Sequence, residues 1–214
     1  MKTSSMQVTS AALAQSAANK AFELFQDRKF RSLADFPNLP QTEQDRIFNE
    51  LVLAGLVMIM LTLEAPDLRV TEELKKDFIS IKDHVGWEYI QQLAGMGIEK
   101  KYLKDWEKLI KMRYEEYALD KLQAREATME IESKEYGLTT EKMFRITLML
   151  PVNTVAIGCH NHICRGKTDG RDELFKIIIK WLGKFYLEVR VPLEGGKIDW
   201  KSKTKAFIKR KLGI

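Results

Sequence analysis

The most hydrophobic stretch of the chain is Leu51–Leu61, LVLAGLVMIML, which contains no polar side chain. Its leucines and methionines favour a helix over a strand. A weak capping-box pattern begins upstream at Thr42, and Pro66 disfavours helix at the residue before it. A helix that is hydrophobic on every side must be buried on every side. The pattern therefore predicts a central buried helix over residues 42–65.

A membrane span is the main alternative for this stretch. Such a span needs about 20 consecutive apolar residues. Extended to 47–63, the stretch includes Asn49, Glu50 and Thr62. It is therefore too short and too polar at its ends, and we favour the core helix of a globular bundle.

The first half of the chain has further helical patterns. Residues 7–34 are rich in alanine and predict a first helix with a small-residue face that permits close packing. A second amphipathic helix begins after Thr71, a candidate N-cap, and ends near residue 94. Residues 98–136 contain no Gly or Pro and predict a long, half-exposed helix. This helix either breaks near 118–127, projects from the body or pairs with a second copy of the chain in a homo-oligomer.

The second half has a less certain pattern around its proline. A helix that opens at 139–141 meets Pro151, which either kinks it or begins a new helix. Residues 152–158 fit a helix or a short strand. A second strongly apolar helix covers 172–187 and is expected to pack against the central helix.

Together these segments predict an all-α bundle of six or seven helices around two buried apolar helices, 42–65 and 172–187. Hydrophobic residues also alternate from Phe185 to Leu193 before a Gly-Gly turn, which leaves a short β-hairpin over 187–200 as an alternative. We expect one helical domain over residues 1–194 and a separate basic segment over 195–214.

Charge sets the last twenty residues apart. They hold seven basic residues and one acidic residue, so they account for the whole net charge of +5 and leave the rest of the chain slightly acidic. Residues 200–212 predict a basic amphipathic helix. Such a helix suits an anionic partner, and we favour nucleic acid over a membrane surface. The residues expected to contact phosphates are Lys201, Lys203, Lys205, Lys209, Arg210 and Lys211.

Both cysteines and two of the three histidines lie within six residues, as Cys159, His160, His162 and Cys164. Thiolate and imidazole are zinc ligands. On a helix, however, His160 and Cys164 share one face, whereas Cys159 and His162 share another about 160° away. One helix therefore cannot present all four side chains to one ion. The alternative is a structural role, with two core cysteines and two polar histidines.

The sequence contains no recognisable catalytic motif. Gly166-Lys167-Thr168 lacks the earlier glycines of a phosphate-binding loop, and no Glu-x-x-His pair of a di-iron bundle is present. Two cysteines and the lack of a signal-peptide pattern favour a cytoplasmic protein. The leading hypothesis is a non-enzymatic binding or adaptor protein whose basic C-terminus contacts nucleic acid. The second is a helical protein with a zinc or redox site at Cys159–Cys164.

Overall fold

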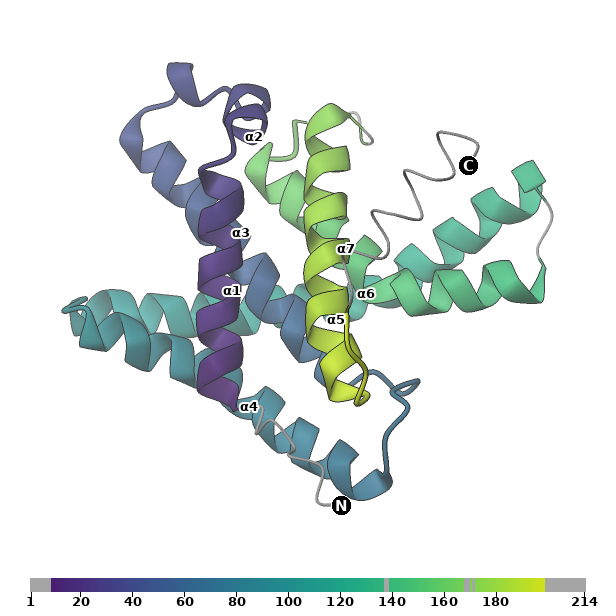
Figure 1. Cartoon of the computed structure of the whole chain (residues 1–214). Coiled ribbons are helices and arrows are strands. Elements are labelled where there is room, and N and C mark those ends of the chain that lie inside the picture. Colours follow the sequence, from purple (N-terminus) through teal and green to yellow (C-terminus); the bar gives the residue numbers. More distant parts are fainter. Residues whose placement is uncertain (1–8, 137–138, 168–169, 171, 199–214) are drawn as a thin grey trace, which may run out of the picture.

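The computed structural model describes residues 9–136, 139–167, 170 and 172–198, and over these ranges it is all-α with no strand (Figure 1). The predicted all-α multi-helix bundle is therefore confirmed. The elements are α1 (Ser10–Phe25), α2 (Arg28–Leu33), the short 3-10 helix η1 (Phe36–Asn38), α3 (Gln41–Leu63), α4 (Glu72–Gly95), α5 (Lys100–Tyr136), α6 (Thr140–Ile163) and α7 (Glu173–Leu193).

The centre of the bundle is α3, as its hydrophobic pattern predicts. Every residue from 50 to 59 is buried, and α1, α4, α5, α6 and α7 all pack against this helix. It begins directly after Pro40, which has no side-chain capping bond, so the expected capping box at Thr42 is wrong. Burial on all sides, rather than a cap, stabilises this helix.

Small residues bring α1 close to α3. Ala14, Ala17 and Ala21 are fully buried, and a Cβ built at Gly55 of α3 would lie only 3.2 Å from the Cβ of Ala17. The single helix expected over 7–34 is wrong. The helix ends at Phe25, and the Asp27 side chain accepts a hydrogen bond from the Phe30 backbone N–H at 2.8 Å, which starts α2 as a separate helix.

The long helix α5 has 37 residues and no break, so the alternative of a break near 118–127 is not observed. It crosses the whole molecule: its first part pairs with α4, and its last part forms a projecting hairpin with the start of α6 (Figure 1). Helix α6 continues through Pro151, which places Val152, Val155 and Ala156 in the core. Of the two alternatives for 152–158, the helix is therefore observed.

Helix α7, the last helix of the described residues, is longer than expected. It runs to Leu193, so the β-hairpin alternative is wrong for residues 187–198, the part of that range that the structure describes. Its buried positions include Phe185, Tyr186, Val189 and Leu193, which follow helical rather than alternating spacing. The guanidinium of buried Arg190 lies 2.9 Å from both the Asp67 and the Glu194 carboxylates. These ion pairs compensate the charge of Arg190. In the alternative strand, the Arg190 side chain would have pointed to solvent.

One described helix, α3, is long and apolar enough to span a membrane. In this structure 78% of its most hydrophobic 18-residue stretch is buried inside the bundle. The core helix of a globular protein meets the same length and composition criteria.

Candidate functional site

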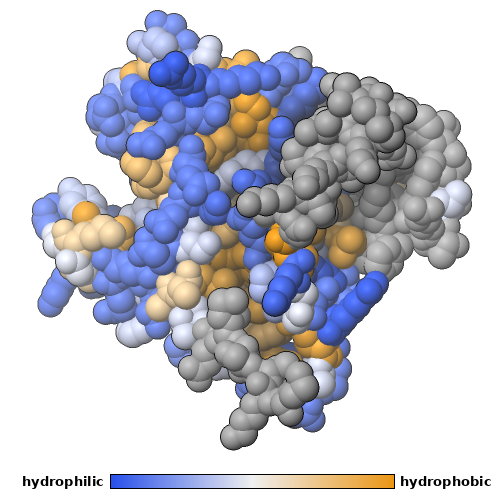
Figure 2. Space-filling model, viewed as in Figure 1, coloured by the Kyte–Doolittle hydropathy of each residue, from blue (hydrophilic) through white to orange (hydrophobic). Residues whose placement is uncertain are grey.

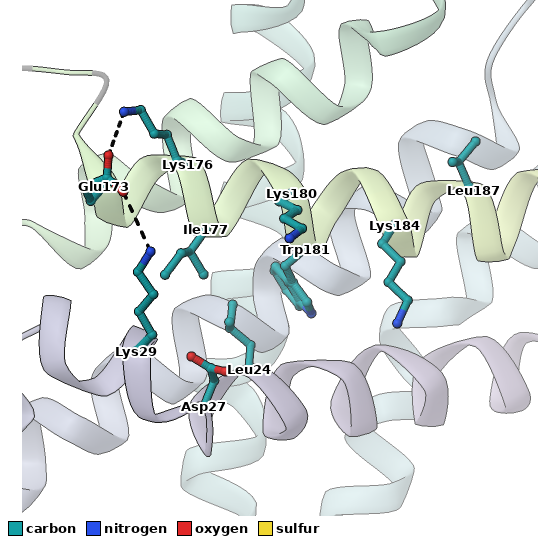
Figure 3. A pocket seen from close by; sticks show the side chains of 10 residues that line it. All are labelled: Leu24, Asp27, Lys29, Glu173, Lys176, Ile177, Lys180, Trp181, Lys184 and Leu187. Carbon is teal, nitrogen blue, oxygen red and sulfur yellow. Dashed lines mark hydrogen bonds and ion pairs between the residues drawn. The ribbon is translucent and has the colours of Figure 1, made fainter. Parts of the chain in front are cut away.

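A groove lies between α7 on one side and the end of α1 with α2 on the other (Figure 3). Its volume is about 670 Å³. The apolar part of its lining consists of Leu24, Ile177, Trp181 and Leu187. In the view of Figure 1, hydrophobic residues lie among hydrophilic residues on the surface around α1 and α7 (Figure 2).

Lysines form one edge of this groove. Lys176, Lys180 and Lys184 are exposed on α7 and line the groove one turn apart, about 6 Å per step along the helix axis. A fourth lysine, Lys29 of α2, lines the opposite side (Figure 3). The three lysines of α7 form a row of positive charge on the helix that leads into the basic C-terminal segment. We call Lys176, Lys180 and Lys184 the α7 lysine row.

Acidic side chains offset part of this charge. Glu173 lies 2.6 Å from the Lys176 ammonium and 3.8 Å from that of Lys29. Lys184 lies 3.8 Å from Glu188. Asp27, the other acidic residue of the lining, is engaged as the N-cap of α2. The groove is therefore a mixed surface with an excess of lysines.

The sequence-predicted phosphate contacts lie outside the described residues. Lys201, Lys203, Lys205, Lys209, Arg210 and Lys211 all belong to this part of the chain. The structure shows where the basic segment begins. Helix α7 ends at Leu193, and the chain leaves this helix through a turn at Gly195, where φ is +75°.

The Cys/His cluster is on helix α6 and the turn directly after it, and its members face different surroundings. Cys159 is fully buried, and its thiol lies 4.0 Å from the Glu50 carbonyl oxygen on α3. The His162 Nε2 atom lies 2.7 Å from Glu116 on α5. The structure therefore does not bring the four predicted ligands to one point.

The other two members of the cluster do lie together. His160 is buried, and its Nε2 atom lies 3.0 and 3.1 Å from the two carboxylate oxygens of Asp172. Possible ligand atoms of His160, Cys164 and Asp172 all lie within 4.8 Å of one another. Sequence spacing pairs His160 with Cys164 but does not indicate Asp172, because Asp172 is the N-cap of the next helix.

A partly buried polar network lies behind His162. The Arg113 guanidinium donates two hydrogen bonds to Glu50, at 2.7 and 3.0 Å, and a third to Glu116 at 3.1 Å. Glu116 then contacts His162. The network links α3, α5 and α6. No spacing in the sequence pairs Glu50 with Arg113, because they are 63 positions apart.

Next to this network, Tyr117 fills a space that only glycine leaves. The tyrosine is fully buried, and a Cβ added at Gly158 would lie 2.2 Å from its ring. Among the described residues its hydroxyl has no hydrogen-bond partner. Burial also raises the pKa of Tyr117 well above its usual value. This contact holds α5 against α6 close to Cys159 and His162.

The two thiols should differ in reactivity. Burial raises the pKa of the Cys159 thiol strongly, and burial also raises that of Cys164, which is only partly buried. Because the thiolate is the reactive form, an aromatic disulfide reagent should label about one thiol per native chain and both after denaturation. In Cys164→Ser the native chain should show no fast-reacting thiol. Rapid labelling of two thiols in the native wild-type chain would contradict this arrangement.

Comparisons with models of protein families, with curated proteins and with solved structures found no match for this chain.

Proposed function

We propose that this protein is a non-enzymatic binding protein that contacts the phosphate backbone of a nucleic acid. The observation that carries the proposal is the concentration of positive charge in residues 195–214, seven basic residues against one acidic residue in an otherwise slightly acidic chain. Lysine and arginine side chains neutralise phosphates and release counterions, which gives affinity with little dependence on sequence.

The α7 lysine row supports the same proposal. Its three ammonium groups stand on the exposed side of the helix that immediately precedes the basic segment. A phosphate backbone held by the C-terminal lysines can therefore extend along α7. The row contributes less than the C-terminal segment, because Glu173 and Glu188 offset part of its charge.

Three full-length variants test these roles. The first reverses Lys201, Lys203 and Lys205 to glutamate, and the second reverses the α7 lysine row. The third is a matched control that reverses Lys100, Lys104 and Lys108, which are exposed on α5 with the same spacing as the α7 row. All three variants change the net charge equally, so differences between them report position rather than total charge.

Binding is measured by fluorescence anisotropy with a labelled DNA duplex at two salt concentrations. The C-terminal variant should bind about 100-fold more weakly, the α7 variant about tenfold, and the α5 control within about twofold of the wild type. For the wild type, log K should fall with log salt at a slope of about −5 if the six predicted side chains contact phosphates.

Two results would reject the proposal. One is the absence of binding by the wild type at low salt. The other is an equal loss in all three variants, because this would reflect net charge and not a defined surface. Vesicles with anionic lipids provide a parallel arm: binding to vesicles without binding to duplex would assign the basic segment to a membrane surface instead.

A further inference from the structure

We propose that His160, Cys164 and Asp172 form a binding site for a zinc-like divalent metal ion at the junction of α6 and α7. This inference is independent of nucleic-acid binding. It replaces the four-ligand set that the sequence suggests, because Cys159 and His162 contact α3 and α5 instead.

The three side chains converge from two elements. His160 is in the last turn of α6, Cys164 follows the end of that helix, and Asp172 is the N-cap of α7. The Cys164 backbone N–H donates to the His160 carbonyl at 2.9 Å, which keeps the i, i+4 pair on one face. Asp172 is held by the Phe175 backbone N–H at 2.7 Å. Backbone hydrogen bonds therefore hold the Asp172 carboxylate and place His160 and Cys164 on one face.

The distances suit a small tetrahedral ion after a modest adjustment of the three side chains. With zinc bonds of about 2.0–2.3 Å, ligand atoms in a tetrahedral site lie roughly 3.3–3.8 Å apart. Here the three possible ligand atoms are within 4.8 Å of one another, and His160 is already 3.0 Å from Asp172. Separations above this range must shorten by up to about 1 Å, and that between His160 and Asp172 must lengthen slightly.

The donor set selects the class of ion. One thiolate, one imidazole and one carboxylate match Zn²⁺ or Co²⁺ rather than Mg²⁺ or Ca²⁺, which prefer oxygen ligands. Three protein ligands leave a fourth position for water or an added ligand. The Asp172 side chain is 38% exposed, so solvent reaches the site from this side.

Basic side chains among the described residues lie near the site: Lys176 interacts electrostatically with Asp172, and Arg46 lies at the end of α6. The Arg46 guanidinium donates to the His162 and Ile163 carbonyl oxygens, at 2.8 and 3.0 Å, at the end of α6. Arg46 opposes a cation electrostatically. Burial and the Asp172 carboxylate raise the pKa of the Cys164 thiol, and Arg46 offsets only part of this rise. Loss of the thiol proton on binding then leaves the ion with two anionic ligands and a neutral imidazole.

The test uses the metal-stripped, full-length protein titrated with Co²⁺. A tetrahedral cobalt–thiolate site should produce visible d–d bands and a near-ultraviolet charge-transfer band that saturate at one ion per chain. Zn²⁺ should displace the cobalt. In hundredfold excess over its Kd, zinc should also raise the Tm by about 5–10 °C.

Variants at the three proposed ligands and at the other two members of the Cys/His cluster separate this site from the alternatives. Cys164→Ser should abolish the charge-transfer band, and His160→Gln and Asp172→Asn should weaken binding at least tenfold. Asparagine is also a good N-cap, so Asp172→Asn retains the start of α7. Cys159→Ala and His162→Gln are the matched controls, and they should bind cobalt as the wild type does.

Each contrary result overturns the proposal. Absence of a saturable band in the wild type would mean that His160 and Asp172 form only a hydrogen-bonded link between the two helices. Loss of the band in Cys159→Ala or His162→Gln would support the ligand set expected from the sequence. Binding that none of the five variants alters would be adventitious.

Discussion

Replacing Arg113 with methionine is expected to destabilise the protein by about 3–5 kcal/mol. The change removes both hydrogen bonds to Glu50, a residue that is only 7% exposed. Arg113 is its only ion-pair partner among the described residues, so the variant leaves a buried carboxylate without compensation. Reversible chemical denaturation, monitored by circular dichroism, measures the loss.

Two controls test the physical reason. Lys75→Met removes an exposed ion pair in which the Lys75 ammonium lies 2.8 Å from the Glu72 carboxylate. This variant should change the free energy of unfolding by less than about 1 kcal/mol. The double variant Glu50→Met/Arg113→Met should be more stable than Arg113→Met alone, because it removes the uncompensated charge together with its partner. If the double variant loses as much as the sum of the two single variants, the penalty does not come from the unpaired carboxylate.

Gly158→Ala is expected to cost about 2–3 kcal/mol, although alanine is the better helix former by about 1 kcal/mol. The new Cβ would lie 2.2 Å from one Tyr117 ring atom and 2.8 Å from two others. The ring is fully buried and cannot move into solvent, so α5 and α6 must separate. A thermal unfolding scan should show a Tm lower by roughly 4–12 °C.

The matched control is Gly183→Ala, in the interior of α7. There the nearest atom to a new Cβ, the Met149 Cε, is 3.7 Å away, which is an ordinary contact. This variant should be neutral or more stable by up to about 1 kcal/mol. Equal stability of the Gly158 and Gly183 variants would show that the Tyr117 ring does not pack against α6 as described.

The hydrophobic pattern predicts much of the fold. An eleven-residue apolar run has to be buried from every direction, so α3 could be assigned as the central helix from its residues alone. Likewise, the absence of Gly and Pro from 98–136 predicted the long helix α5. Helix ends were harder, because a single local bond decides them: the Asp27 cap divides α1 from α2, and no pattern of apolar residues marks it.

The candidate sites divide in the same way. The C-terminal charge and the Cys/His cluster are local features, so the amino-acid sequence by itself determined them, together with the all-α class and the central helix. Only the tertiary structure decided that Asp172 joins His160 and Cys164, and that Arg113 neutralises Glu50. Those contacts depend on how helices distant in sequence pack together, and a periodic pattern specifies which face of a helix is buried but not which partner it meets.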